Sequence, residues 1–321
     1  MSWAWNFGGG GAKKKTNPTE LQRQLLDRAA HVRAKLGERP PTYFPDNLEH
    51  VLFVSSSYTK GSDDGGEQQR QQHERGFCNW LIPHHLMVGQ YPGQTPELGG
   101  ANPHDVQQHL EYLVQDAGVR LFCSLQSELP AQTDDMAWAQ KDGLIFLEPD
   151  YVRRQFPRPF TQYAPMVRDI MATTNDNNNS NNNQPIFLHA PIEDLNVPES
   201  QEPLQQLLLE LLDFLCHKDD DDDDENTNSS CIYVHCWGGR GRAGLVGGCL
   251  LSLLWPCLDA DQVLAWIQTG YATRLGHDQM SSALSTSPQT SQQRSFVRQF
   301  VQDYQQPVSY THLTLPTNRE V

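Results

Sequence analysis

The chain has 321 residues, of which 37% are hydrophobic and 20% charged, and its formal net charge is −15. This length allows one large domain or two small ones, and the acidic balance excludes a generally basic nucleic-acid binder. No apolar stretch reaches the roughly 20 residues of a membrane span, so neither nucleic acid nor a membrane is expected as a partner. The seven cysteines lack paired or zinc-ligand spacing, which indicates reduced thiols, no metal and no cofactor. We therefore expect a cytoplasmic protein, with the nucleus and the oligomeric state left open.

The first 76 residues are interpreted as an N-terminal extension. Its Gly- and Lys-rich start is typical of disorder. A helix is predicted over Pro18–Leu36, because apolar residues recur every three or four positions and Gly37 follows. Val51–Val54 favours a short strand, and the polar, Gln-rich residues 61–75 are typical of a linker.

Strands and helices then alternate, which predicts a single α/β domain over residues 77–307 with a central, mostly parallel sheet flanked by helices. The Asn-rich run 175–183 and the Asp-rich run 219–225 fall between elements and are expected to be solvated insertions. Residues 308–321 resemble a translated sequencing adaptor and are left out of the fold prediction. The predicted strands are Leu86–Val88, Val119–Leu125, Leu144–Leu147, Ile186–His189 and Cys231–Val234, and the predicted helices are Pro103–Ala117, Pro159–Ala172, Pro203–Cys216, Arg242–Leu254, Ala260–Thr269 and Ser287–Tyr304.

The segment C-I-Y-V-H-C-W-G-G-R-G-R-A-G, residues 231–244, carries the chemistry. A strand enters a Gly-rich turn that opens a helix, and amides turned inward at a helix N-terminus form a cradle for anions. Cys236 stands at its mouth, where the amides and the helix dipole favour the thiolate, and the planar fork of Arg242 can hold two phosphate oxygens. The pattern thus joins a nucleophile to an oxyanion cradle and a fixed cation. The residues expected to form the cradle are Trp237, Gly238, Gly239, Arg240 and Gly241.

The sequence His235-Cys236, followed by Arg242, resembles the H-C-x5-R signature of the cysteine-dependent protein tyrosine and dual-specificity phosphatases. Further segments extend the resemblance over residues 77–304, and they are most similar to the kinase-associated phosphatases of the cyclin-dependent-kinase-inhibitor type. These segments are Leu86–Gly89, Leu121–Ser124, Pro191–Asp194 and Gln289–Gln293.

The resemblance implies a phosphoric monoester hydrolase that works in two steps. Cys236 attacks phosphorus while Arg242 and the loop amides hold the phosphoryl oxygens. Asp194 then protonates the leaving oxygen, and later activates the water that hydrolyses the phosphocysteine. Asp194 follows a strand on a Pro-bounded loop, and its neighbour Glu193 is the rival for this role.

The resemblance also implies roles for supporting residues. His235 would orient the loop, and Gln289 and Gln293 would position water, unless they are ordinary surface residues of a polar helix. Cys123, at a strand end, would trap an oxidised nucleophile as a disulfide, with a buried structural cysteine as the equal alternative. Most of the family has Ser or Thr where this chain has Ala243. The phosphatases of regenerating liver are similar in this alanine and are slow enzymes, so slow turnover is expected.

The predicted substrate is a phosphorylated protein, with phosphotyrosine first and phosphoserine or phosphothreonine left open. A recognition motif of the classical tyrosine-specific enzymes is not found, which favours a shallow, dual-specificity pocket. Two alternatives remain at this point. One is a catalytically weak or dead phospho-binding module, and the other is a phosphatase for phosphoinositides or nucleotides, because Arg240 adds a cation to the loop.

Overall fold

The computed structural model describes residues 18–40, 77–96, 103–174, 184–216, 231–274 and 285–304. The strand expected at 51–54, the linker at 61–75, both low-complexity runs and the last residues lie outside this part of the chain. In chain order the elements are α1 (Pro18–Leu36), β1 (Cys78–Ile82), β2 (Leu86–Gly89), α2 (Pro103–Glu111), the π-helical turn η1 (Tyr112–Asp116), β3 (Val119–Gln126), α3 (Asp135–Ala139), β4 (Leu144–Ile145), α4 (Asp150–Gln155), β5 (Phe160–Thr161), α5 (Ala164–Thr174), β6 (Ile186–Ile192), α6 (Gln201–Cys216), β7 (Cys231–His235), α7 (Arg242–Leu254), α8 (Ala260–Ala272) and α9 (Ser291–Tyr304).

A five-stranded sheet forms the centre and confirms the predicted α/β class. Its order is β1-β2-β7-β3-β6, with β2, β7, β3 and β6 parallel and β1 antiparallel to β2. The sequence of β7, C-I-Y-V-H, is buried throughout, as expected of a parallel strand with helices over both faces. Pro191 lies in the outermost strand β6, which fits a residue that cannot donate to a central ladder.

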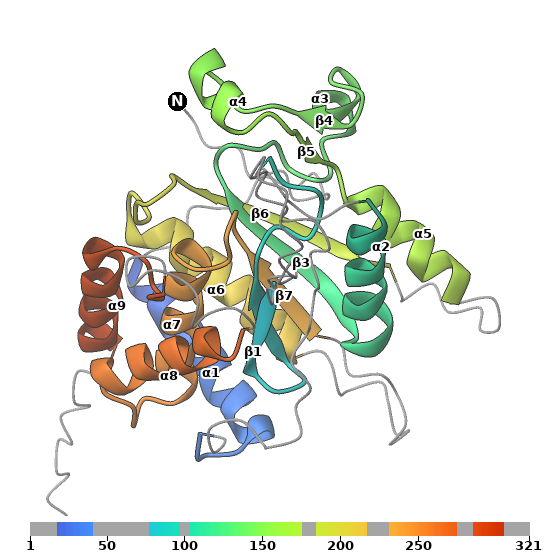
Figure 1. Cartoon of the computed structure of the whole chain (residues 1–321). Helices are drawn as coiled ribbons and strands as arrows, with labels where there is room; N and C mark the ends of the chain where they lie inside the picture. The colour runs from blue at the N-terminus through green and yellow to red at the C-terminus, as the bar shows by residue number, and fades with distance from the viewer. Residues whose placement is uncertain are drawn as a thin grey trace, which may run out of the picture.

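Helices cover both faces of the sheet (Figure 1). Helices α2 and α5 pack on one face, and α1, α6, α7, α8 and α9 gather on the other. The short elements α3, β4, α4 and β5 stand together at the top of Figure 1, and β4 pairs with β5 in a small sheet of its own. They all come from the connection between β3 and α5.

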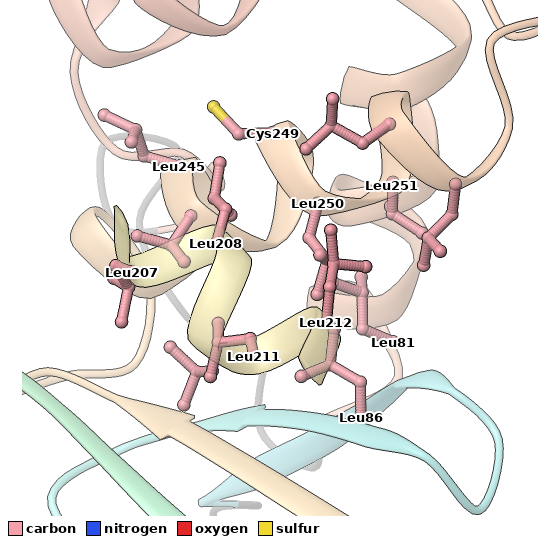
Figure 2. Packing of buried hydrophobic residues seen from close by; sticks show 14 of the residues in the cluster. Leu81, Leu86, Leu207, Leu208, Leu211, Leu212, Leu245, Cys249, Leu250 and Leu251 are labelled. Atoms are coloured by element: carbon pink, nitrogen blue, oxygen red, sulfur yellow. The ribbon is translucent and has the colours of Figure 1, made fainter. Parts of the chain in front are cut away.

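Helix α7 is the centre of the larger hydrophobic cluster. All of its residues are buried, as expected of a helix that is apolar on every side. The leucines of α6 pack against it (Figure 2), where they meet side chains from β1 and β2. The labelled residues in that view are Leu81, Leu86, Leu207, Leu208, Leu211, Leu212, Leu245, Cys249, Leu250 and Leu251.

Helix α1, predicted from its periodicity, forms with the expected bounds and is part of this same core. Its last turn also caps two other helices. Arg33 Nη1 donates to the carbonyl of Leu254 at 3.2 Å, and Lys35 Nζ donates to that of Cys216 at 2.6 Å. Cations at helix C-termini satisfy carbonyls that lack intrahelical partners. The buried α1 side chains are Leu21, Leu25, Ala29 and Val32.

Several element bounds differ from the prediction. The helix expected from Pro159 begins only at Ala164, because Phe160 and Thr161 pair with β4. The strand expected at Leu144–Leu147 is reduced to two residues outside the main sheet. The last helix begins at Ser291 rather than Ser287, and strands β1 and β5 were not predicted.

Candidate active site

The predicted site residues come together at one edge of the sheet. The parallel strands end there, β2 at Gly89, β3 at Gln126, β6 at Ile192 and β7 at His235. The loops that follow these strands therefore meet, and in α/β folds ligands bind beyond the carboxyl ends of the strands. Cys236 opens the loop after β7, and its side chain is buried with 3% exposed.

The loop after Cys236 has its backbone carbonyls directed away from the space that the loop encloses. The carbonyl of Trp237 accepts a hydrogen bond from the backbone N–H of Tyr91 at 3.0 Å. The carbonyl of Arg240 accepts one from the hydroxyl of Ser287 at 2.8 Å. The partners come from the loop after β2 and from the segment before α9, so two distant parts of the chain hold the loop.

Arg274 binds the carbonyls of the two residues between Trp237 and Arg240. Its guanidinium donates to the carbonyls of Gly239 at 2.8 Å and Gly238 at 3.3 Å. It also donates to the carbonyl of Val88 and to the side-chain oxygen of Asn79. Arg274 is only 5% exposed, so this cation lies beneath the loop rather than at its mouth.

The hydrogen bonds to the four carbonyls of residues 237–240 determine which way the loop amides point. In a trans peptide the N–H lies opposite the C=O. Outward carbonyls at residues 237–240 therefore turn the N–H groups of residues 238–241 to the opposite side, where α7 begins. Consecutive amides that converge in this way form the anion cradle expected from the glycines.

Space requires a glycine at position 239 of the cradle and leaves little room beside Gly241. Gly239 has a φ of +65°, and a Cβ there would overlap the backbone of Gly89. A Cβ on Gly241 would lie 2.9 Å from Oε1 of Gln293 and 3.3 Å from Cβ of Gln289. Gly238 differs, because a Cβ there would meet nothing within 4 Å and the residue is exposed. The backbone of Gly238 is thus open to an approaching substrate.

Arg242, the first residue of α7, is 1% exposed and has several acceptors. Glu128 binds it with both carboxylate oxygens, at 2.6 Å to Nη1 and 2.9 Å to Nη2. Nη1 also donates to the carbonyl of Ile192 at 3.0 Å, and Nη2 forms an ion pair with Asp194 Oδ1 at 2.9 Å. Burial lowers the pKa of Arg242, but the hydrogen bonds to Glu128 and the charges of Cys236, Glu128 and Asp194 outweigh burial and raise it.

The loop after β6 separates the two acidic candidates. Asp194 faces Arg242, and its side chain is 48% exposed. Glu193 instead accepts a hydrogen bond from the side-chain amide of Asn196 at 2.9 Å. Leu195, the residue after Asp194, has a φ of +62° in the turn. Of the two carboxylates, Asp194 is therefore the one beside the phosphate-binding groups.

The two predicted glutamines both reach the cradle. Gln293 is fully buried, and its side chain lies against Gly241. Its amide nitrogen donates to the carbonyl of Asn196 at 3.0 Å, which links α9 to the loop that carries Asp194. Gln289 approaches Gly241 through its Cβ.

His235 lies in the aromatic layer under the loop. Nε2 is 2.8 Å from the hydroxyl of Tyr163, and the ring contacts Tyr91 edge-on. Burial lowers the pKa of His235 to about 3, so the ring is neutral. A neutral ring fixed by a hydroxyl suits the orienting role expected for it.

Trp237 and Cys123 also lie next to the cradle. The Trp237 ring meets Phe156 and Phe160 edge-on, with centroids 5.5 and 5.3 Å apart, so it ties the loop to α4 and β5. Cys123 pairs with Val234 and shares the core with Cys236. The two thiols are therefore buried in the same cluster, and a disulfide between them stays a prediction.

Sequence reasoning missed Glu128 and Arg274. Glu128 follows the buried strand β3, where a carboxylate at the carboxyl edge of a parallel sheet could have been noted. Arg274 ends the segment after α8 and offers no comparable signal, because its partners are 35 or more residues away. Within the described residues we find no group of three or more His, Cys, Asp or Glu that could hold a metal ion. In the same ranges, no helix is long and apolar enough to cross a membrane.

A buried thiol, a loop whose carbonyls are bonded away from it and a fixed guanidinium lie together here, which is an arrangement suited to an anion. Residues 164–307 match the family described as PTP-SAK, Swiss Army Knife protein, DSP-PTPase phosphatase domain. This part of the chain is therefore similar to the cysteine-based tyrosine and dual-specificity phosphatase domains. Strands β1 to β3, which complete the same sheet, lie before the matched residues.

Solved structures give weaker similarities. Tk-PTP in its active form is 14% identical, covering 70% of this chain and 96% of its own, with a TM-score of 0.39. Kinase associated phosphatase (KAP) is 14% identical, with 73% of this chain and 97% of the KAP chain covered and a TM-score of 0.41. PTPMT1 in complex with PI(5)P is 13% identical, covering 71% and 96%, with a TM-score of 0.36. These values are alike, so the expected closeness to the kinase-associated group is not established. A search of curated proteins found no match.

Proposed function

We propose that the chain is a phosphoprotein phosphatase that hydrolyses phosphotyrosine through a phosphocysteine on Cys236, with phosphoserine and phosphothreonine as substrates to be tested beside it. The observation that carries the proposal is the set of four outward carbonyls, which leaves four amides and Arg242 around one thiol. Preorganised donors of this kind stabilise the charge on the phosphoryl group in the transition state of its transfer.

The first step transfers the phosphoryl group. The Cys236 thiolate forms the S–P bond as the P–O bond to the substrate breaks, and Asp194 gives its proton to the leaving oxygen. For this, phosphate oxygens take the place of Asp194 on Nη2 of Arg242, while Glu128 keeps its two bonds. Arrival of the phosphate therefore releases the acid toward the leaving group.

The second step hydrolyses the phosphocysteine. Asp194 takes a proton from water, the water oxygen bonds to phosphorus, and the thiolate of Cys236 leaves. Gln293 and Gln289 lie against Gly241 and are the residues we assign to positioning that water. Turnover is proposed to be slow, because Ala243 has no hydroxyl to donate to the sulfur.

The decisive experiment is a phosphatase assay of wild type beside Cys236→Ser. The substrates are phosphotyrosine, phosphoserine and phosphothreonine peptides, soluble inositol phosphates and an aryl phosphate. Wild type should release phosphate from tyrosine peptides and the aryl phosphate, and Cys236→Ser should release none. Equal activity in both proteins, or binding of phosphopeptides by wild type without any turnover, would contradict the proposal and favour a phospho-binding module.

A further inference from the structure

A pocket of about 530 Å³ adjoins the candidate active site on the side of β4 and α4. One of its walls is Glu128, whose carboxylate holds Arg242, so the pocket begins directly behind the phosphate-binding arginine. The remaining lining residues are Lys141, Ile145, Phe146, Leu147, Glu148 and Arg153.

Two cations of this pocket are available to a ligand. Lys141 and Arg153 have no ion-pair partner within the described residues. The guanidinium of Arg153 lies over the ring of Phe146, 4.1 Å from its centroid, which holds it flat and leaves its N–H groups free for an acceptor. Since Glu128 is committed to Arg242, Glu148 is the remaining acid among the lining residues, and the pocket favours an anion.

The pocket has a fixed position relative to the nucleophile. Phe156, at the end of α4, and Phe160 of β5 both pack against Trp237, the residue after Cys236. An anionic group bound in the pocket would therefore stand at a constant distance from a phosphate in the cradle. This is what recognition of two groups on one substrate requires.

We propose that Lys141 and Arg153 form a subsite for an acidic side chain close to the phosphorylated residue of a peptide substrate. The proposal rests on the phosphatase function given above. The chain's net charge of −15 opposes any anionic ligand, but it opposes the many charges of an anionic membrane surface more than the few charges of a peptide, which favours a peptide over a lipid headgroup. Tyr151, in the same helix as Arg153, is 72% exposed and gives a peptide an apolar surface beside the cations.

The test uses phosphotyrosine peptides that differ by a single Asp-to-Asn change, placed in turn at each position within four residues of the phosphotyrosine. The quantity measured is kcat/KM for wild type, Lys141→Ala, Arg153→Ala and Arg154→Ala. Arg154 is the matched control, because it is the next residue of the same helix, is exposed, and does not line the pocket. An aryl phosphate and a pair of soluble inositol mono- and bisphosphates complete the set.

At one or two positions, Asp should raise wild-type kcat/KM by roughly two- to fivefold over Asn, as expected for partly exposed ion pairs. High salt should remove the gain. Lys141→Ala and Arg153→Ala should lose it, Arg154→Ala should keep it, and turnover of the aryl phosphate should be alike in all four. No gain at any position, or a gain that survives both substitutions, would overturn the subsite. A cation-dependent preference for the inositol bisphosphate instead of acidic peptides would replace the peptide by a lipid headgroup.

The aryl phosphate separates this proposal from the phosphatase function. If wild type hydrolyses it and Cys236→Ser does not, the function stands whatever the peptides show. If wild type fails to hydrolyse it, the function fails, and the same peptides are titrated against Cys236→Ser by fluorescence anisotropy. An affinity gain with Asp that depends on Lys141 and Arg153 would then support the subsite, and its absence would end it.

Discussion

Replacing Asp194 by alanine should separate binding from catalysis. Without substrate, Asp194 is paired with Nη2 of Arg242 at 2.9 Å, on a guanidinium whose other Nη contacts go to Glu128 and Ile192. Phosphate must therefore displace Asp194 to gain a second contact with Arg242 beside Nε. Asp194→Ala removes this competitor together with the proton donor.

The two effects have opposite signs. With the Asp194 side chain 48% exposed, its pair with Arg242 is worth about 0.2–1 kcal/mol, so its loss should tighten binding of inorganic phosphate by up to about fivefold. Loss of a general acid should lower kcat for phosphotyrosine peptides by about 10²–10⁴-fold. An aryl phosphate with a good leaving group needs little protonation and should lose much less.

The assay is steady-state turnover of both substrates together with the inhibition constant of inorganic phosphate. Glu193→Ala is the matched control, since Glu193 is the preceding residue and contacts Asn196 instead of the cradle. Its kcat should stay within a few-fold of wild type. The reasoning fails if Glu193→Ala is the damaging change, or if Asp194→Ala weakens phosphate binding.

Four further substitutions test other parts of the structure. Ala243→Ser should raise the steady rate by roughly ten- to a hundredfold and shrink a pre-steady-state burst of aryl phosphate hydrolysis, and an unchanged progress curve would contradict this. After peroxide treatment, a thiol reductant should restore the activity of wild type but not that of Cys123→Ser. Equal recovery of activity in both proteins would exclude the disulfide. Burial lowers the pKa of His109 from 6.5 to about 3. Between these pH values the unfolded chain therefore binds one more proton at His109 than the folded chain. The free energy of unfolding that the buried neutral ring contributes is lost as the pH falls through this range. His109→Leu should therefore make the acid-induced loss of unfolding free energy shallower by about 1.4 kcal/mol per pH unit, and an identical slope would refute the burial argument. Leu25→Ala, in the α1 core, should lower the unfolding free energy by about 2–5 kcal/mol, and the exposed Leu26→Ala serves as its control.

The elements with strong periodicity were predictable from the sequence. Helix α7 has the predicted bounds, Arg242–Leu254, because an uncharged, mostly apolar run follows Arg242 between a Gly-rich turn and Pro256. Helix α1 was predicted from its single apolar stripe. What the stripe could not indicate is its partner, because an amphipathic face does not specify the surface that covers it. The predicted extension therefore contributes a helix to the main core.

The connection between β3 and α5 was the least predictable part. Strands β4 and β5 have two residues each, too few for an alternating pattern to be recognised. Their pairing depends on contacts such as that of Trp237 with Phe160, which join residues far apart in the sequence. The same reason hid Glu128, which is 114 residues from Arg242 along the chain. Local patterns predicted the nucleophile loop because its function is encoded in consecutive residues, whereas the groups that hold this loop in place are scattered.

The contacts around the loop also bear on which chemical step limits the rate. The amides of residues 238–241, Arg242 and the buried Arg274 all favour negative charge, both on the thiolate and on the phosphoryl oxygens. They remain in place whatever residue follows Arg242. A hydroxyl at position 243 would act on the sulfur alone, which must leave as thiolate in the second step. With Ala243 the cradle can form the phosphocysteine but gives its sulfur one donor fewer on departure, and so we expect the intermediate to accumulate.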